Sequence, residues 1–242
     1  MCGYLPTLVL FLLALTGHAD ADTKSSVARL EVRYRTPKTL EASFLERYTE
    51  NGRLVRVEAG IVYFKRPGKM RWDYQAPERN LFLVDGKTAW FYVPADHTAT
   101  RVPAKESADW RTPLALLVGD MKLSRVCEHV LPAIDERPEN PEHAMLYCQL
   151  RGAASKSPKR ALGDSPSQKP LNGESVFFEI DTNSGDLARV LVRDPGGVGI
   201  EFSFTNWRMD PQVPDSLFRF DVPKGVAIVN GELPSGQGGV NR

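Results

Sequence analysis

The sequence predicts a mainly β protein: a single, strongly curved antiparallel sheet of about eleven short strands, with only two or three short helices. The clearest signal lies in residues 60–90. There Met70, Trp72 and Tyr74 alternate with polar residues, which is the period of a strand with one buried face. The dipeptide Asp85-Gly86 then separates two further apolar runs and favours a two-residue hairpin turn. The pattern alone would also suit a plain β-sandwich.

Strands at 40–48 and 54–64 are expected before this region, joined by a turn at Asn51-Gly52. A modest amphipathic helix over 25–35 precedes them and ends at Pro37. In the second strand we expect the apolar face to consist of Val55, Val57, Ala59, Ile61 and Tyr63, with Arg56 and Glu58 pointing the other way.

Further strands are expected in the second half of the chain, where short apolar runs alternate with turn residues. They cover residues 122–131, 144–150, 175–181, 187–193 and 200–207. A helix is expected at 113–118. Residues 152–173 contain almost no large apolar side chain, which predicts a flexible insertion.

The N-terminus predicts export. Residues 5–17 form an apolar run too short to span a bilayer, and Ala19-Asp20-Ala21 matches a signal-peptide cleavage pattern. We therefore expect a removed signal peptide at 1–21 and one domain at 22–242. A buried N-terminal helix is the alternative. Cys2 precedes the apolar run, so it is not expected to be a lipid-attachment site.

Composition and motifs argue against several classes of function. Lys and Arg number 31 against 30 Asp and Glu, so no general positive field would attract nucleic acid. The chain lacks the sequence motifs of serine hydrolases, zinc proteases, P-loop proteins and dinucleotide-binding enzymes. We expect no catalytic residues, no metal site and no cofactor.

Cys127 and Cys148 are the two cysteines that remain after signal removal. They lie in two successive expected strands with a turn rich in Pro, Asn and Glu between them. In an exported protein such a pair predicts a disulfide, whereas reduced buried thiols would be the expectation in the cytoplasm.

Many aromatic side chains fall on the expected strands, more than one strand layer can hide by itself. Helices or a ligand must therefore cover them, although a solid core would also account for them. Together with Met70 these residues are Tyr63, Trp72, Tyr74, Phe82, Trp90, Phe91, Phe178, Phe202 and Phe204.

Three motifs in the same order resemble the LolA family of periplasmic lipoprotein carriers. The first joins Lys65-Arg66-Pro67, Met70 and Trp72 to residues 83–94, which read L-V-D-G-K-T-A-W-F-Y-V-P. The second is T-P-L-A-L-L at 112–117, similar to the family's lid helix. The third is F-R-F-D-V-P-K-G-V at 218–226. Residues 151–172 have no counterpart in the resemblance.

The resemblance implies an incomplete barrel, a half-barrel whose lid of short α-helices covers an apolar cavity for acyl chains. Arg66 would be the lid latch, its guanidinium bonded to carbonyls of the lid helices, and Leu114 and Leu117 would join the aromatic residues as acyl-binding positions. Met70 stands near the barrel mouth, where the family often has Phe.

The resemblance also implies a periplasmic monomer. It would take acylated lipoproteins from a LolCDE-type inner-membrane transporter and pass them to a LolB-type outer-membrane acceptor. The alternatives are an RseB-like lipid-sensing regulator and a structural β-domain with a filled core.

Overall fold

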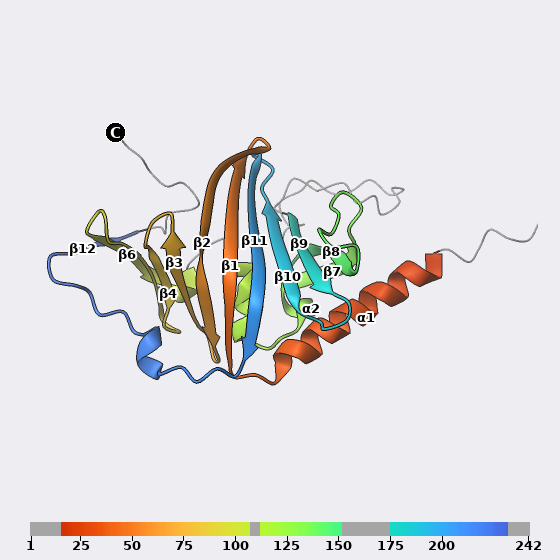
Figure 1. Cartoon of the computed structure of the whole chain (residues 1–242), viewed down its shortest axis with the longest axis horizontal. Coiled ribbons are helices and arrows are strands. Elements are labelled where there is room, and N and C mark those ends of the chain that lie inside the picture. Colours follow the sequence, from red (N-terminus) through yellow and green to blue (C-terminus); the bar gives the residue numbers. More distant parts are fainter. Residues whose placement is uncertain (1–15, 107–111, 152–174, 232–242) are drawn as a thin grey trace, which may run out of the picture.

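The computed structural model describes residues 16–106, 112–151 and 175–231, and within them twelve strands form one curved sheet (Figure 1). Its spatial order is β12-β6-β5-β4-β3-β2-β1-β11-β10-β9-β8-β7. The strands are β1 Thr39–Glu50, β2 Arg53–Lys65, β3 Lys69–Ala76, β4 Leu81–Val84, β5 Thr88–Val93, β6 Thr98–Pro103, β7 Cys127–Pro132, β8 His143–Leu150, β9 Ser175–Asp181, β10 Leu187–Arg193, β11 Val198–Met209 and β12 Ala227–Asn230. The mainly β, curved-sheet prediction is confirmed.

Two meanders of antiparallel hairpins meet at the centre of the sheet, where β1 pairs with β11. The long strands β1, β2 and β11 make the middle of the sheet, and shorter strands make its two sides (Figure 1). One pair departs from the antiparallel pattern, because β12 runs parallel to β6. A long connection separates β12 from β11, so β12 can enter the sheet beside β6 and run in the same direction as β6.

The apolar face expected for the second strand is wrong. Tyr63 opposes Arg71, whereas Val62 opposes Trp72, so Tyr63 lies on the side of the sheet away from Trp72. The exposed side chains of Val55 and Val57 lie at the other end of β2. The residues that face Trp72 are the even-numbered set, which includes Gly60, Val62 and Phe64, all buried, but also Arg56 and Glu58.

We call the side of the sheet that carries Trp72 the inner face, because the lid elements pack on it. These elements are the short 3-10 helix η2 (Thr112–Val118) and the single-turn helix α2 (Leu123–Val126). Leu114, Leu117 and Leu123 are fully buried in the same cluster as Trp72. Two further 3-10 turns are η1 (Ala104–Glu106) and η4 (Asp215–Phe218).

Helix α1 (Thr16–Arg35) starts nine residues before the helix expected from periodicity and begins inside the segment predicted to be removed. Leu30 and Tyr34 are its fully buried apolar residues, but Ser26 and Thr23 are buried as well. In the middle of the helix, small polar side chains therefore take buried positions at which an apolar repeat was expected. The helix lies beside the β9–β10 turn, since Tyr34 Oη accepts the N–H of Leu187 at 2.9 Å.

The cysteine region differs in its first residues from the strand expected at 122–131. Residues 123–126 form α2, and the strand starts only at Cys127. The N–H of Leu123 donates to Glu31 Oε1 of α1 at 3.0 Å, so this turn is tied to the helix. Cys127 and Cys148 form a disulfide with their Cα atoms 5.3 Å apart. The insertion expected at 152–173 lies outside the described residues.

A buried ion pair on the outer face fastens the connection between β7 and β8. Glu179 and Arg189 are joined at 2.7 Å, and His143 Nδ1 and the N–H of Glu139 contact the other carboxylate oxygen at 2.9 and 3.0 Å. Arg189 also donates to the carbonyl of Arg137 at 2.8 Å. Burial opposes ionisation of Glu179, but the hydrogen bonds and the guanidinium outweigh it and lower its pKa below the ordinary value.

Candidate functional site

Trp72 is the centre of an aromatic cluster on the inner face. Its ring centroid lies 4.8 Å from Phe44 and 5.0 Å from Phe202, with Phe64 and Phe204 at 6.1 and 6.2 Å. These partners come from β1, β2 and β11, so residues far apart in the sequence meet on one wall. Offset and edge-on ring contacts of this kind add to the free energy of apolar burial.

Gly60 allows this cluster to form. A Cβ atom at this position would lie 2.0 Å from the carbonyl oxygen of Asp73 and 3.0 Å from the Phe44 ring. Any side chain here would therefore push β3 away from β2. Glycine gives the Phe44 and Tyr74 rings room to approach to 5.1 Å.

Ten of the twelve apolar positions expected from the sequence lie on the inner face or in the lid. Trp72 opposes Phe82 and Phe82 opposes Phe91, so all three share this face. The remaining members are Met70, Tyr74, Phe178, Phe202 and Phe204 on the sheet and Leu114 and Leu117 in η2. In this structure the cluster is packed against the lid, so an acyl chain could enter only if η2 moved.

Tyr63 and Trp90 do not belong to this cluster. Trp90 opposes Leu83 on the outer face, where its ring lies 5.2 Å from Phe220. Strand alternation puts Trp90 and its neighbour Phe91 on opposite faces. Trp90 therefore helps to hold the C-terminal segment that crosses the outer face, and Tyr63 lies on that same outer face.

Arg66, in the β2–β3 turn, clasps the C-terminal end of α1. Its guanidinium donates to the carbonyls of Arg35 at 2.7 Å and Pro37 at 2.8 Å, and also to that of Tyr34. A planar group with five donors suits such a set of carbonyls, which a lysine could not bind in the same way. Partial burial lowers the pKa of Arg66, with Asp120 and Asp210 opposing that effect.

The same turn also holds the end of η2. The N–H of Gly68 donates to the carbonyl of Val118 at 3.0 Å. One three-residue turn, 66–68, thus bonds to α1 through a side chain and to η2 through its backbone. Arg66 was expected to bond to carbonyls of the lid helices; its acceptors lie instead at the end of α1, and the contact to η2 comes from Gly68. Its role as a latch stays a prediction.

A polar group interrupts the apolar inner face near the β1–β2 turn. Glu46 is 1% exposed and accepts a hydrogen bond from Tyr74 Oη at 2.8 Å. Arg56 Nε lies 2.8 Å from Glu58, and Arg56 Nη2 lies 3.8 Å from Glu46. Sequence reasoning missed this group because Arg56 and Glu58 were assigned to the other face. The sequence did contain a signal: Gly60, Val62 and Phe64 stand at even-numbered positions of the strand. Arg56 and Glu58 do so too, and therefore share their face.

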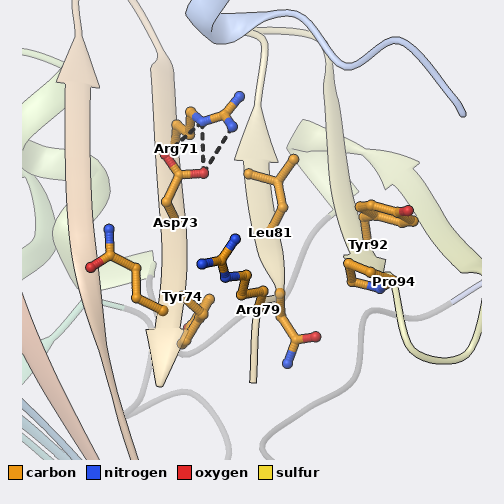
Figure 2. Close-up of a pocket in the computed structure, with 9 residues that line it drawn as sticks. Arg71, Asp73, Tyr74, Arg79, Leu81, Tyr92 and Pro94 are labelled. Carbon is orange, nitrogen blue, oxygen red and sulfur yellow. Dashed lines mark hydrogen bonds and ion pairs between the residues drawn. The ribbon is translucent and has the colours of Figure 1, made fainter. Parts of the chain in front are cut away.

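A separate pocket of about 620 Å³ opens on the outer face, at the far end of β3 and β4 (Figure 2). Figure 2 shows Arg71 turned toward Asp73, with its Nε 2.9 Å from the carboxylate. Arg71 also donates to the carbonyl of Leu217 at 2.9 Å. Arg71 therefore holds the C-terminal segment and is itself held by Asp73. The rest of the lining consists of Tyr74, Gln75, Arg79, Asn80, Leu81, Tyr92 and Pro94.

Within the described ranges, no cluster of three or more His, Cys, Asp or Glu side chains has the arrangement of a metal site. No helix in that part of the chain has both the length and the apolar character needed to cross a membrane.

Comparison with known proteins gives consistent matches. A family model for "Outer membrane lipoprotein carrier protein LolA" matches residues 35–131. An outer-membrane lipoprotein carrier protein of Chromobacterium violaceum is 29% identical over 217 residues, which are 89% of this chain and 93% of that protein. A protein of the same name from Nitrosospira multiformis is 25% identical over 227 residues, which are 91% of this chain and 95% of that protein.

Solved structures resemble the chain more loosely. An uncharacterized conserved protein from Thermus thermophilus covers 86% of this chain and 98% of its own, at 14% identity and a TM-score of 0.48.

Proposed function

We propose that this chain, a member of the LolA family by sequence, is a carrier that binds the acyl chains of lipoproteins on its inner face. The observation that supports this most directly is that lid elements cover an aromatic wall and are hydrogen-bonded to a turn beside it. Trp72 and its neighbours form the wall, and the turn carrying Arg66 and Gly68 fastens both α1 and η2. No enzymatic step is required for this function.

The physical need for such a carrier is clear from the cargo. Each methylene of an acyl chain contributes about 0.8 kcal/mol to staying in an apolar environment, so a lipoprotein with two or three chains does not cross water by itself. A carrier must therefore offer the acyl chains an apolar surface on which they are about as stable as in the membrane. It must also close when empty, because an open aromatic wall would bind to membranes or to other proteins.

The carrier would work in the periplasm after removal of residues 1–21. In the empty state the Arg66 clasp favours closure, and cargo from a LolCDE-type transporter would displace η2 from the inner face. Transfer to a LolB-type acceptor would then be assisted by re-formation of the clasp. Because the three acceptors of Arg66 in the described part of the chain are all backbone carbonyls, this contribution does not depend on the side chains of α1.

Two rivals remain to be tested. A structural β-domain is favoured by the burial of Trp72, Phe178 and Phe202, each fully inaccessible to solvent in this structure. An RseB-like sensor would use the same inner face for lipid and report its occupancy to a membrane regulator.

Extraction of the exported protein separates these functions. The chain is purified from a periplasmic fraction without detergent, extracted, and analysed by mass spectrometry for both lipid and lipid-modified peptide. A carrier yields acylated peptide, a sensor yields lipid without peptide, and a structural domain yields neither. The Arg66→Leu variant serves as the loaded reference, since weakening the closed state should raise its cargo content.

A further inference from the structure

We propose that Glu46, Arg56, Glu58 and Tyr74 form a subsite for the polar, lipid-modified N-terminus of the cargo, so that its acyl chains point toward the Arg66 end. This inference rests on the proposed carrier function and specifies how the cargo lies. The four side chains come from β1, β2 and β3 and share the inner face.

The inner face changes in polarity along the strands. On β1, Leu40, Ala42 and Phe44 are followed by Glu46. On β2 the opposite residues repeat this order, because Phe64 and Val62 lie beside Leu40 and Ala42, whereas Glu58 lies beside Glu46. On β1 and β2 the inner face is therefore apolar next to the Arg66 turn and carries its charged side chains toward the Asn51 turn, whereas on the β11 side Phe202 lies opposite Glu46.

The fold alone gives no reason for charges at this place. Two carboxylates directly opposite each other on one face of a sheet repel, and Arg56 must lie between them to compensate. Apolar side chains of similar volume generally replace a buried ionic group without loss of stability. A polar group that the sheet does not need is more simply explained by what binds there.

The chemistry of the group fits the head of a lipoprotein. Ester and amide carbonyls at a lipid-modified cysteine accept hydrogen bonds, which the Arg56 guanidinium with its five N–H groups can donate. The Tyr74 hydroxyl donates its proton to Glu46 and so holds that carboxylate in place. The following peptide N–H groups donate hydrogen bonds, which the carboxylates of Glu46 and Glu58 can accept. Ionic partners make such bonds stronger than those between neutral groups.

The dimensions of the inner face are also suitable. The stretch of β1 from Leu40 to Glu46 spans about 20 Å at the rise of a strand. Half of a bilayer's hydrocarbon core is about 15 Å thick. An acyl chain starting at Glu46 would therefore find apolar wall over its whole length before reaching the Arg66 turn.

Photo-crosslinking of the full mature chain tests the orientation. Two synthetic acylated lipopeptides are used, one with a diazirine on the residue after the modified cysteine and one with it at the end of an acyl chain. We expect the first to label residues 46–58 and the second to label residues 40–44, 62–72 or 114–123. Reversed or mixed labelling overturns the orientation and leaves the carrier function standing. Absence of inner-face labelling by both probes overturns the carrier function itself.

Tyr74→Phe tests the subsite with minimal disturbance, since it removes only the hydroxyl that bonds to Glu46. We expect binding of the lipopeptide to weaken about three- to tenfold. The variant keeps the ring on the aromatic wall, so the affinity for a hydrophobic dye without a polar head should fall much less than the affinity for the lipopeptide. Tyr48→Phe is the matched control, because the Tyr48 hydroxyl bonds to Glu50 at 3.0 Å, at the end of β1. Equal losses for dye and lipopeptide, or no loss for either, would overturn the subsite.

Discussion

The N–H of Gly68 donates to the carbonyl of Val118 at 3.0 Å, so the turn between β2 and β3 touches the last residue of η2. Two residues away in the sequence, Arg66 bonds to the end of α1. The one turn between β2 and β3 thus contacts the ends of both α1 and η2. Changes at this turn should alter lid movement without altering the aromatic wall.

Arg66→Leu should leave the fold intact and retain cargo. The variant loses the hydrogen bonds to three carbonyls in the closed state, and we expect that state to lose about 1.5 kcal/mol, which slows release about tenfold. Transfer from donor to acceptor membranes measures this. Arg53→Leu, at the exposed far end of β2, is the control and should transfer normally. Normal release by Arg66→Leu would show that Arg66 is only an arginine in a turn.

Phe91→Ala and Trp90→Ala should differ in the binding of a hydrophobic dye. The two residues are neighbours, but Phe91 packs on the inner cluster and Trp90 on Phe220 of the outer face. We expect the first variant to change dye affinity severalfold and the second to leave it unchanged. Acylated peptide should displace the dye from the wild type, whereas unacylated peptide should not. Equal displacement by both peptides would favour a structural domain.

Replacing both Cys127 and Cys148 by Ser should lower the free energy of unfolding by about 3 kcal/mol, since the bridge closes a loop across 21 positions of the chain. The large sheet should still form and still bind dye. Denaturant unfolding with and without reductant gives the difference. Peptide mapping of periplasmic protein checks the bond directly, and two thiols that alkylate without reductant would contradict it.

Glu179→Gln should destabilise the protein at neutral pH and flatten its acid unfolding. The pKa of Glu179 is lower in the folded protein than its ordinary value, so the stabilisation is complete above the unfolded value of about 4.3 and is lost as pH falls through the folded value. Arg189 keeps Glu201 at 3.2 Å but loses its shorter, charge-assisted hydrogen bond to Glu179, which should cost about 2 kcal/mol at pH 7.

Unfolding midpoints measured at several pH values from neutral to acid test the Glu179 prediction. Asp215→Asn is the control, because the pKa of this carboxyl is also lowered, by a hydrogen bond from Lys65, but its side chain is exposed. Its acid unfolding should match that of the wild type. An unchanged acid limb in Glu179→Gln would show that other carboxylates control acid stability.

The sequence by itself determined the class of the fold and most of the aromatic wall. Alternation at Met70, Trp72 and Tyr74 identifies which residues share a face, because successive side chains of a strand point to opposite sides. The Asp85-Gly86 turn similarly defines a hairpin from local backbone preference. Such local rules need no knowledge of distant strands.

Only the tertiary structure decided which face of each strand is the inner one. In residues 54–64 both the odd and the even positions include apolar side chains, so periodicity could not choose between Tyr63 and Phe64. Pairing with β3 makes the choice, because it aligns Phe64 with Met70 and Tyr63 with Arg71. The register of β2 on β1 likewise brings Arg56 and Glu58 to Glu46, and long-range register of this kind is a property of the assembled sheet.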